Sequence, residues 1–422
     1  MREMKDSGFE WIGEIPVNWE VDKLKFHLKR NEPRNPGDTV VLSLYRELGV
    51  IPKDSRDDNH NVTSEDTSKY KYVQPGDFVI NKMKAWQGSV AVSEYEGIVS
   101  PAYFIYKFTD DAFYRRYFHY LLRSCYKDEF MRLSGGIRVG QWDLPSVALD
   151  NTAVIIPPMK EQKSIAAFLD VKCAEIDALT ADIQTQIDTL EQYKRSVITE
   201  AVTKGLNPDV EMKDSGTPWC PLIPIHWKYA NPKALFTQRL DRAYPGDKQL
   251  TASQEYGVIY QDEYMELTGT KIVTVMKDFS ILKHVEPNDF VISMRSFQGG
   301  LEYSERRGSI SSAYVMLIPN NEYVYPPFYR WFFKSSKYIN AIQSTSNLVR
   351  DGQAMRYANF AQVPLFIIPL DEQKQISEYL DEKVRKIDEI LKSKKSQLEI
   401  LAEYKKSLIY EYVTGKKEVP AI

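Results

Sequence analysis

The sequence predicts a mixed α/β protein built from two tandem copies of one unit, each a globular domain followed by a long helix. Residues 4–8 read MKDSG, and the same five residues return at 212–216. The tripeptide EQK at 161–163 returns at 372–374, at nearly the same offset. Each EQK stands near the start of a run of more than 40 residues that contains no glycine or proline. Ordered landmarks that recur at a fixed period indicate an internal duplication.

The duplication continues inside the globular halves but weakens in places. Residues 73–80 read VQPGDFVI and correspond to VEPNDFVI at 285–292. Residues 52–70 and 260–278, in contrast, show no convincing alignment. Because loops can change without disrupting a core, this pattern indicates a shared scaffold that carries two different surfaces.

Length and composition restrict the class of protein. A chain of 422 residues is too long for one ordinary domain and fits two to four. No run of about 18 apolar residues is present, so we expect a soluble, cytoplasmic protein with no membrane partner. The three cysteines, Cys125, Cys173 and Cys220, form no C-x-x-C pair, which argues against a disulfide framework or a zinc site.

The charge balance does not by itself predict a nucleic-acid partner. The formal net charge is −3, and only residues 212–369 show a clear positive excess, of +3. Domains that bind nucleic acid usually carry a basic excess. Composition alone would therefore not assign DNA binding to this chain.

The two runs without glycine or proline are predicted to be long helices over 159–203 and 371–414. Each has apolar residues at heptad spacing, and a glycine follows each run as a terminator. One helix cannot bury such a seam alone, so we expect the two helices to pack on each other as an antiparallel coiled-coil spacer. The alternative is that each helix folds back on its own domain. The seam residues are Ile176, Ile183, Leu190 and Val197 in the first helix and Ile387, Leu401 and Leu408 in the second, with Gly205 and Gly415 as terminators.

The globular halves show short β-rich runs separated by turn signals, together with aromatic-rich helical segments. We expect strands at 77–81, 98–108 and 153–156, and helices at 113–122 and 328–333. The predicted domains are 1–158, the helix and linker 159–211, a second domain 212–369, a second helix 370–415 and a tail 416–422.

Motifs for catalysis are missing from the sequence. It contains neither a nucleotide-binding P-loop nor a G-x-G-x-x-G turn, and its five histidines are dispersed. Residues 325–328 read YPPF, which resembles the NPPF motif of amino-methyltransferases but has tyrosine in place of the amide. Residues 208–213 imitate a nuclease metal site, although their acids lie too close together in a linker. We therefore predict a protein that is not an enzyme by itself.

One stretch in each half combines a cation, an aromatic ring and an amide. Arginine and lysine can donate to guanine, glutamine can pair with adenine, and aromatic rings can stack on bases. These stretches are therefore candidate DNA-binding sites; the alternative is a surface strand whose aromatic residues face the core. The candidates are Lys82, Lys84, Trp86 and Gln87 in the first half and Arg295, Phe297 and Gln298 in the second.

A second candidate stretch lies late in each half. Each of these loops contains arginine, glycine and glutamine, and glycine allows the backbone to approach a phosphate closely. Early loops of both halves are weaker candidates. The late residues are Arg138, Gln141, Arg350, Gln353 and Arg356, and the early ones are Tyr45, Arg46 and Gln254.

Together these residues resemble one family, the specificity subunit of Type I restriction-modification systems. The resemblance rests on MKDSG followed by WIGEIP at 11–16, the PGD of 75–77, and the PPMKEQKSI of 157–165. The long helix follows, and the same order then recurs. The second copy departs from the pattern with WCPLIP at 219–224 and with a single proline before its EQK.

The resemblance implies two target-recognition domains, each followed by a conserved spacer helix and each reading one half of an asymmetric, bipartite site in double-stranded DNA. It also implies two methylation subunits that carry S-adenosylmethionine, and restriction and translocation subunits that use ATP and Mg. The chain itself would bind none of these cofactors. The rival interpretation is a non-catalytic scaffold that joins proteins and does not read DNA.

Overall fold

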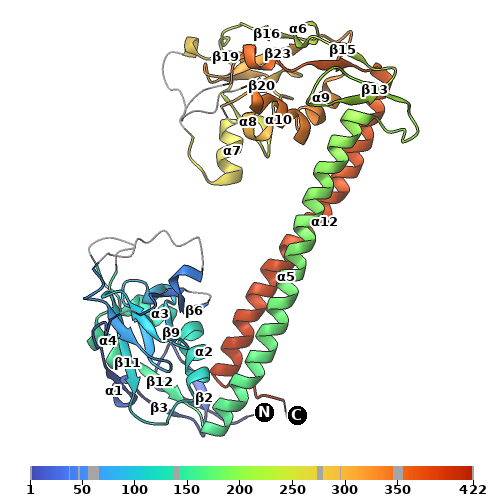
Figure 1. Cartoon of the computed structure of the whole chain (residues 1–422). Helices are drawn as coiled ribbons and strands as arrows, with labels where there is room; N and C mark the ends of the chain where they lie inside the picture. Colours follow the sequence, from blue (N-terminus) through green and yellow to red (C-terminus); the bar gives the residue numbers. More distant parts are fainter. Residues whose placement is uncertain are drawn as a thin grey trace. The chain divides into compact units, whose positions relative to one another are not determined.

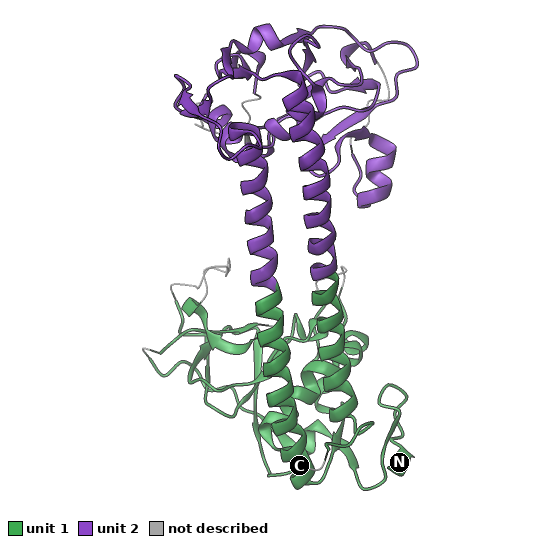
Figure 2. Ribbon diagram, turned by 90° about the vertical axis from the view of Figure 1, so that its right-hand side faces the viewer, with its two compact units in different colours: residues 1–183, 396–422 green, residues 184–395 purple. Residues whose placement is uncertain are grey.

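The computed structural model describes residues 2–37, 39–45, 48–55, 66–136, 142–272, 279–294, 296–345 and 355–420. The chain divides into two compact units, residues 1–183 with 396–422 and residues 184–395 (Figure 2). Each unit contains one globular domain and one part of each of the two long helices.

The first domain is built around a four-stranded antiparallel sheet of order β4-β11-β8-β9, of which Figure 1 labels β9 and β11. Helix α2 covers one face of this sheet, and its Phe118 packs edge-on against Phe78 of β8 with ring centroids 5.2 Å apart. The opposite face carries a smaller apolar cluster that includes Val79 and Ile105. The elements are β1 (Met4–Asp6), β2 (Glu14–Pro16), β3 (Glu20–Lys23), α1 (Leu24–His27), β4 (Leu28–Arg30), β5 (Leu42–Tyr45), β6 (Gly49–Pro52), the 3-10 helix η1 (Lys53–Ser55), β7 (Lys71–Val73), β8 (Phe78–Asn81), the 3-10 helix η2 (Ala85–Gln87), β9 (Val90–Val92), β10 (Gly97–Val99), β11 (Tyr103–Phe108), α2 (Arg115–Cys125), α3 (Lys127–Leu133), α4 (Ser146–Asp150) and β12 (Ala153–Ile156).

The second domain repeats this topology. Its four-stranded sheet has the order β16-β23-β20-β21, and each two-stranded pairing of the first domain has a counterpart. This confirms the mixed α/β fold and its tandem duplication. The elements are β13 (Met212–Asp214), β14 (Leu222–Pro224), β15 (Lys228–Ala230), α6 (Pro232–Leu235), β16 (Phe236–Arg239), β17 (Leu250–Ser253), β18 (Gly257–Tyr260), α7 (Gln261–Thr268), the 3-10 helix η3 (Phe279–Ile281), β19 (Lys283–Val285), β20 (Phe290–Ile292), α8 (Ser296–Gly299), β21 (Glu302–Tyr303), β22 (Gly308–Ile310), β23 (Val315–Pro319), α9 (Pro326–Phe332), α10 (Ser336–Ser344), α11 (Tyr357–Phe360) and β24 (Leu365–Ile367).

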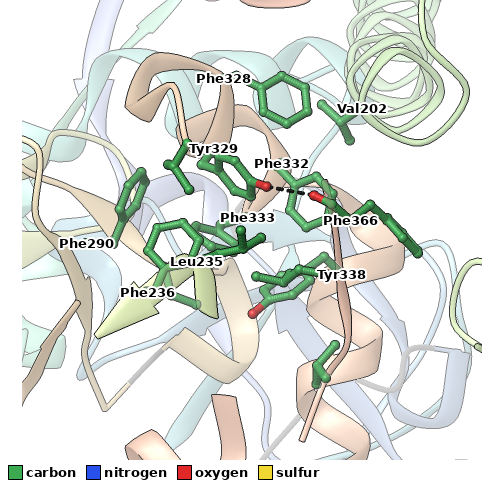
Figure 3. Close-up of a cluster of buried hydrophobic side chains, with 14 of the residues drawn as sticks. Val202, Leu235, Phe236, Phe290, Phe328, Tyr329, Phe332, Phe333, Tyr338 and Phe366 are labelled. Carbon is green, nitrogen blue, oxygen red and sulfur yellow. Dashed lines mark hydrogen bonds between the residues drawn. The ribbon is translucent and has the colours of Figure 1, made fainter. Parts of the chain in front are cut away.

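Aromatic side chains dominate the core of the second domain (Figure 3). Phe236 of β16 packs against Phe290, Tyr329 and Phe333, with ring centroids between 5.1 and 5.7 Å. The hydroxyl of Tyr329 is buried and donates a hydrogen bond of 3.1 Å to the Phe366 carbonyl oxygen. Each fully buried side chain of this size contributes about 1.5–3 kcal/mol of transfer free energy, so the aromatic cluster stabilises the domain strongly.

The long helices α5 (Met159–Lys204) and α12 (Leu370–Val413) run antiparallel within each unit. In the first unit, the rings of Phe168 and Tyr412 lie 4.5 Å apart, and Lys405 pairs with Asp177 at 2.6 Å. In the second unit, Lys194 of α5 pairs with Asp388 of α12 at 2.6 Å. Residue numbers rise along one helix as they fall along its neighbour, which confirms the antiparallel pair. No helix within the described ranges is both long and apolar enough to cross a membrane.

The end of each long helix packs against the globular domain of its unit. Gly415 follows α12 with φ of +73°, and a Cβ there would lie 2.5 Å from Pro16 and 2.8 Å from Trp19. Gly205 follows α5 with φ of +76°, and a Cβ there would lie 2.9 Å from the Glu372 carboxylate and 3.9 Å from Trp227. The predicted terminators are thus confirmed, since both adopt the left-handed conformation that favours glycine.

One predicted strand was wrong. The run 98–108 divides into β10, which pairs with β7, and β11, which joins the central sheet. A turn separates the two strands, in which the Tyr103 amide donates to the Ser100 carbonyl oxygen at 3.0 Å. Pro101 within this turn has no amide hydrogen and therefore could not continue a strand ladder.

The copies differ in structure at the place where their sequences fail to align. After β6, the first domain continues into the short 3-10 helix η1 (Lys53–Ser55). After β18, the second domain forms the two-turn helix α7, which ends at Gly269 with φ of +65°. Equivalent positions on one scaffold therefore carry different local structures.

Candidate nucleic-acid interface

The repeated glutamates join each domain to the start of its long helix. The Trp19 indole donates to Glu161 at 2.9 Å, and the Trp227 indole donates to Glu372 at 3.0 Å. Arg2 also donates to Glu161, at 2.8 Å. Both tryptophans are fully buried, so each carboxylate satisfies an indole N–H that would otherwise lose its hydrogen bond.

The repeated glutamines complete the same joints. Gln162 is fully buried, donates to the carbonyl oxygens of Ala112 and Pro157 at 2.7 and 2.8 Å, and accepts from the Tyr114 amide at 2.8 Å. Gln373 makes the corresponding three bonds in the second domain, each of 2.8 Å. The repeated glutamates and glutamines are therefore structural, because they fix each domain on its helix.

A second pair of carboxylates lies nine residues, about two and a half turns, farther along the helices. Asp170 accepts from the Tyr120 hydroxyl and from Arg116, both at 2.7 Å. Asp381 accepts from the Trp331 indole at 2.7 Å and also pairs with Arg330. In both domains, one aspartate of a long helix thus accepts a hydrogen bond from an aromatic side chain and pairs with an arginine.

The YPPF segment also has a structural role. Tyr325 precedes α9, and its amide donates to Gln373 at 2.8 Å. Pro326 occupies the first position of α9, where the missing amide hydrogen costs no hydrogen bond. Within the described ranges, no group of three histidine, cysteine or acidic side chains could hold a metal ion.

In the first domain, the candidate stretch 82–87 lies against the base of the late loop. Lys82 pairs with Asp143 at 2.7 Å, and its carbonyl oxygen accepts from the Leu144 amide at 3.0 Å. The rings of Trp86 and Trp142 lie 5.4 Å apart. The stretch forms the 3-10 helix η2, so the alternative of a surface strand is wrong here.

The four side chains of this stretch differ in exposure. Lys84 is exposed at the start of η2, whereas Lys82 and Trp86 are half-buried. The Trp86 indole donates to the Met83 carbonyl oxygen at 3.1 Å, which fixes the ring on its own turn. Gln87 is half-buried at the edge of a cleft in the first unit. Lys84 is therefore the most accessible candidate for a nucleic-acid contact in this stretch.

The cleft has a volume of about 1110 Å³ and lies between the first domain and the helix pair of the same unit. His119 lines it, and Arg123 lies 3.0 Å from the His119 ring nitrogen Nε2. Burial, together with Arg123 and Arg116, lowers the pKa of His119 to about 3. The imidazole is therefore neutral at pH 7 and contributes no positive charge to the cleft.

In the second domain, the structure describes only part of the corresponding stretch. Gln298 is exposed on α8, and the side chain of Gln254 lies against Gly299, where an added Cβ would be 2.5 Å from the Gln254 amide carbon. The loop that contains Gln254 and the candidate stretch at α8 are therefore neighbours. Arg295 and the side chain of Phe297 lie outside the described residues.

Several residues of the other loops also lie outside the described parts of the chain. Arg356 is exposed just before α11, where its amide donates to Asn359 at 3.0 Å. Tyr45 is half-buried on β5. The loop residues that the structure does not describe are Arg46, Arg138, Gln141, Arg350 and Gln353.

Sequence reasoning missed a group of cations beside the first candidate stretch. Arg30 of β4 and Lys71 of β7 lie 4.3 and 5.7 Å from the centroid of Phe104, and Lys82 lies 5.9 Å from it. Glu32 pairs with both Arg30 and Lys71. No sequence signal joins these residues, because they come from four separate segments that only the folded domain brings together.

The chain is a duplicated α/β protein whose two domains both carry candidate recognition residues. Residues 16–189 match the family model described as the Type I restriction modification DNA specificity domain. The putative type I restriction enzyme MjaX specificity subunit of Methanocaldococcus jannaschii is 24% identical over 97% of this chain and 96% of its own length. The EcoBI specificity subunit of Escherichia coli is 22% identical over 73% of this chain and 66% of its own.

Solved structures show the same fold. A chain from a study of complex assembly and conformational transition of the type I R-M system has a TM-score of 0.70 at 12% identity, and the match covers 96% of this chain and 99% of that one. The HsdS subunit from Thermoanaerobacter tengcongensis has a TM-score of 0.52 at 13% identity, covering 96% and 98%. The resemblance drawn from the sequence is confirmed: residues 16–189 match the specificity-domain model, and the relatives that match along most of the chain carry the name of type I restriction enzyme specificity subunits.

Proposed function

We propose that this chain reads a bipartite, asymmetric site in double-stranded DNA, with one half-site for each globular domain. The proposal rests on a contrast between the residues that attach each domain to its long helix and the residues on the surface of each domain. The joints at Gln162 and Gln373 are the same in both domains, whereas residues 52–70 and 260–278 do not align and form the 3-10 helix η1 in one domain and the helix α7 in the other. Two copies that conserve their attachment and vary their surfaces suit the reading of two unlike half-sites.

The candidate reading residues are those exposed beside η2 and α8, led by Lys84, Gln298 and Arg356. Lysine and arginine can donate to guanine O6 and N7, and glutamine can pair with adenine. We propose the same role for the candidate residues that lie outside the described parts of the chain, among them Arg138 and Arg350.

We propose that the chain contributes no catalytic group of its own. Two methylation subunits with S-adenosylmethionine would modify adenine, and restriction and translocation subunits with ATP and Mg would cut. With a formal net charge of −3, the chain would obtain much of its phosphate contact from the methylation subunits. The isolated chain should then bind DNA weakly, and the assembled complex should bind tightly.

An exchange of residues 1–158 for those of a relative tests the proposal. The joint should survive the exchange, because the three hydrogen bonds of the Gln162 side chain use backbone atoms of Ala112, Tyr114 and Pro157. We expect one half of the methylated sequence to change while the other half stays the same. An unchanged methylated sequence would favour the scaffold interpretation instead.

A further inference from the structure

A short β-bridge stands at the same place in both globular domains. Arg34 lies opposite Lys71 of β7, and Arg242 lies opposite Lys283 of β19, each in antiparallel pairing. A backbone hydrogen bond flanks each bridge on both sides, so the two arginines occupy equivalent positions. The flanking bonds, from amide to carbonyl oxygen, are Tyr72 to Pro33 (2.8 Å) and Asn35 to Tyr70 (3.0 Å) in the first domain, and His284 to Asp241 (3.0 Å) and Ala243 to Leu282 (3.1 Å) in the second.

The lysine of each bridge is tied to a turn that contains a tyrosine. The Lys71 ammonium donates to the Tyr103 carbonyl oxygen at 2.5 Å, and the Lys283 ammonium donates to the Tyr314 carbonyl oxygen at 2.6 Å. Both lysines are half-buried, and Lys71 also pairs with Glu32 at 3.0 Å. The two lysines therefore have a structural role, because they hold the same turn in both domains.

The arginine of each bridge is exposed. Residues directly opposite each other in an antiparallel pair project from the same face, so each arginine lies beside its lysine. Arg242 donates to the Ile281 carbonyl oxygen at 3.1 Å, and within the described parts of the chain neither Arg34 nor Arg242 pairs with a carboxylate. A guanidinium has five N–H donors, so both arginines keep donors for a ligand.

In the second domain, two like charges face each other. Burial, together with the neighbouring Arg242, lowers the pKa of Lys283. Among the residues of this domain that the structure describes, no acidic side chain forms an ion pair with Arg242 or Lys283. An anion bound beside Arg242 would offset the repulsion between the two cations.

Each bridge lies beside a candidate DNA-binding stretch. The strand that begins at Tyr103 pairs with β8, which leads into the first stretch, and the strand that follows Tyr314 pairs with β20, which leads into the second. In the first domain, Lys71 and Lys82 lie 5.7 and 5.9 Å from the centroid of one ring, that of Phe104. The exposed arginines therefore stand next to the residues proposed to read bases.

We propose that Arg34 and Arg242 each contact a phosphate of the DNA backbone beside the half-site that its own domain reads. A phosphate is the same in every DNA sequence, so the residue that contacts it can be the same in both domains while the residues that read bases differ. Residues 32–35 read EPRN and the corresponding residues 240–243 read LDRA, so arginine is the only identity. The planar fork of arginine matches a phosphate group. This assignment rests on the proposed function, because it names phosphate contacts for the same DNA-binding domains.

Loss of one phosphate contact has a defined effect on binding. It lowers the slope of log affinity against log salt concentration by about 0.9. The same relation gives a loss of affinity of about eightfold at 0.1 M salt and about fourfold at 0.2 M salt. Because the contact carries no sequence information, target and unrelated DNA should lose affinity equally.

The experiment uses the full chain assembled with its methylation subunits. Binding to a duplex that carries the methylated sequence, and to an unrelated duplex of the same length, is measured across a salt series for wild type, Arg34→Met, Arg242→Met and the double variant. We expect each single variant to lower the salt slope by about 0.9 and the double variant by about 1.8, on both duplexes. The ratio of the two affinities and the methylated sequence should stay the same.

The double variant Lys163→Met with Lys374→Met is the matched control. These exposed lysines also recur in both copies, but they lie at the starts of the long helices and not beside a candidate stretch. The control removes as much charge as the double arginine variant, and we expect it to leave the salt slope unchanged. Arg34→Lys with Arg242→Lys keeps the charge and should retain the slope. Thermal unfolding of each variant checks that these exposed substitutions leave the fold intact.

Three outcomes would overturn different statements. If the wild-type complex does not prefer the methylated sequence to unrelated DNA, the proposed function fails and the phosphate contacts fail with it. If the wild type has this preference but the arginine-to-methionine variants keep its salt slope, only the phosphate contacts are wrong. A loss of affinity confined to the target, or a changed methylated sequence, would show that the arginine reads a base, which also contradicts the assignment.

Discussion

Replacing Gln162 by leucine should destabilise the first unit strongly. Leucine has a similar volume but removes three hydrogen bonds, to Ala112 and Pro157 and from Tyr114, at 2.7 to 2.8 Å. Each buried group left unsatisfied costs about 1–3 kcal/mol. Because two of the three bonds are only partly buried, water can reach some of these groups, and we expect a loss of about 3–5 kcal/mol.

The measurement is urea denaturation of wild type and variant, followed by circular dichroism. The midpoint of the first unit should fall while the slope stays constant, which indicates a change in stability rather than in compactness. Lys163→Met is the control, because Lys163 is the exposed neighbour of Gln162 and should change stability by less than about 0.5 kcal/mol. A Gln162→Leu variant within about 1 kcal/mol of wild type would refute the structural role of the joint.

Three further predictions concern the two units and their long helices. Gly205→Ala should cost about 1 kcal/mol of stability for the left-handed backbone alone. Gly415→Ala should cost about 2–4 kcal/mol, because the Cβ at position 415 also meets a rigid proline and a tryptophan ring. Equal losses of the two variants in denaturation would contradict this difference. His119 has a folded pKa of about 3, below its unfolded value, so it stabilises the fold above pH 6.5, and that contribution disappears as the pH falls toward 3. A His119→Gln variant should therefore lose about 2 kcal/mol less than wild type between pH 7 and pH 5 in denaturation, and equal losses would show that the histidine is not buried neutral. Leu408→Ala should cost about 2–4 kcal/mol, since Leu408 is only 6% exposed within the apolar core of the first unit. Asp177→Asn should cost less than about 1 kcal/mol, because the ion pair of Asp177 is on the surface. The reverse order would mean that charge, not the apolar seam, holds the helices together.

The long helices were predictable from the sequence because their signals are local. An uninterrupted run, a heptad of apolar residues and a terminal glycine each act within one helix, so the predicted bounds 159–203 and 371–414 lie within one residue of α5 and α12. The division of 98–108 into two strands depends on a turn at Pro101, whose effect was outweighed by the β-rich composition around it. Strand order depends on pairing between residues far apart in the sequence, so neither the proline nor the β-rich composition could predict it.

The candidate site was predictable only in part, for a related reason. The pattern of cation, aromatic ring and amide located η2, but it could not distinguish the exposed Lys84 from Lys82, which pairs with a carboxylate 61 residues away. Arg30 and Lys71 carried no signal, because only the folded domain brings them to Phe104. Sequence patterns identify side-chain chemistry, whereas the partners that engage each side chain come from the fold.

Mapping methylated adenines in the genome of cells that carry this chain and its methylation subunits tests the central proposal most directly. We expect one sequence made of two unlike half-sites at a fixed separation, and we expect exchange of residues 1–158 to alter only one of them. A continuous or palindromic methylated sequence, or one that the exchange leaves unchanged, would contradict the assignment of one half-site to each domain.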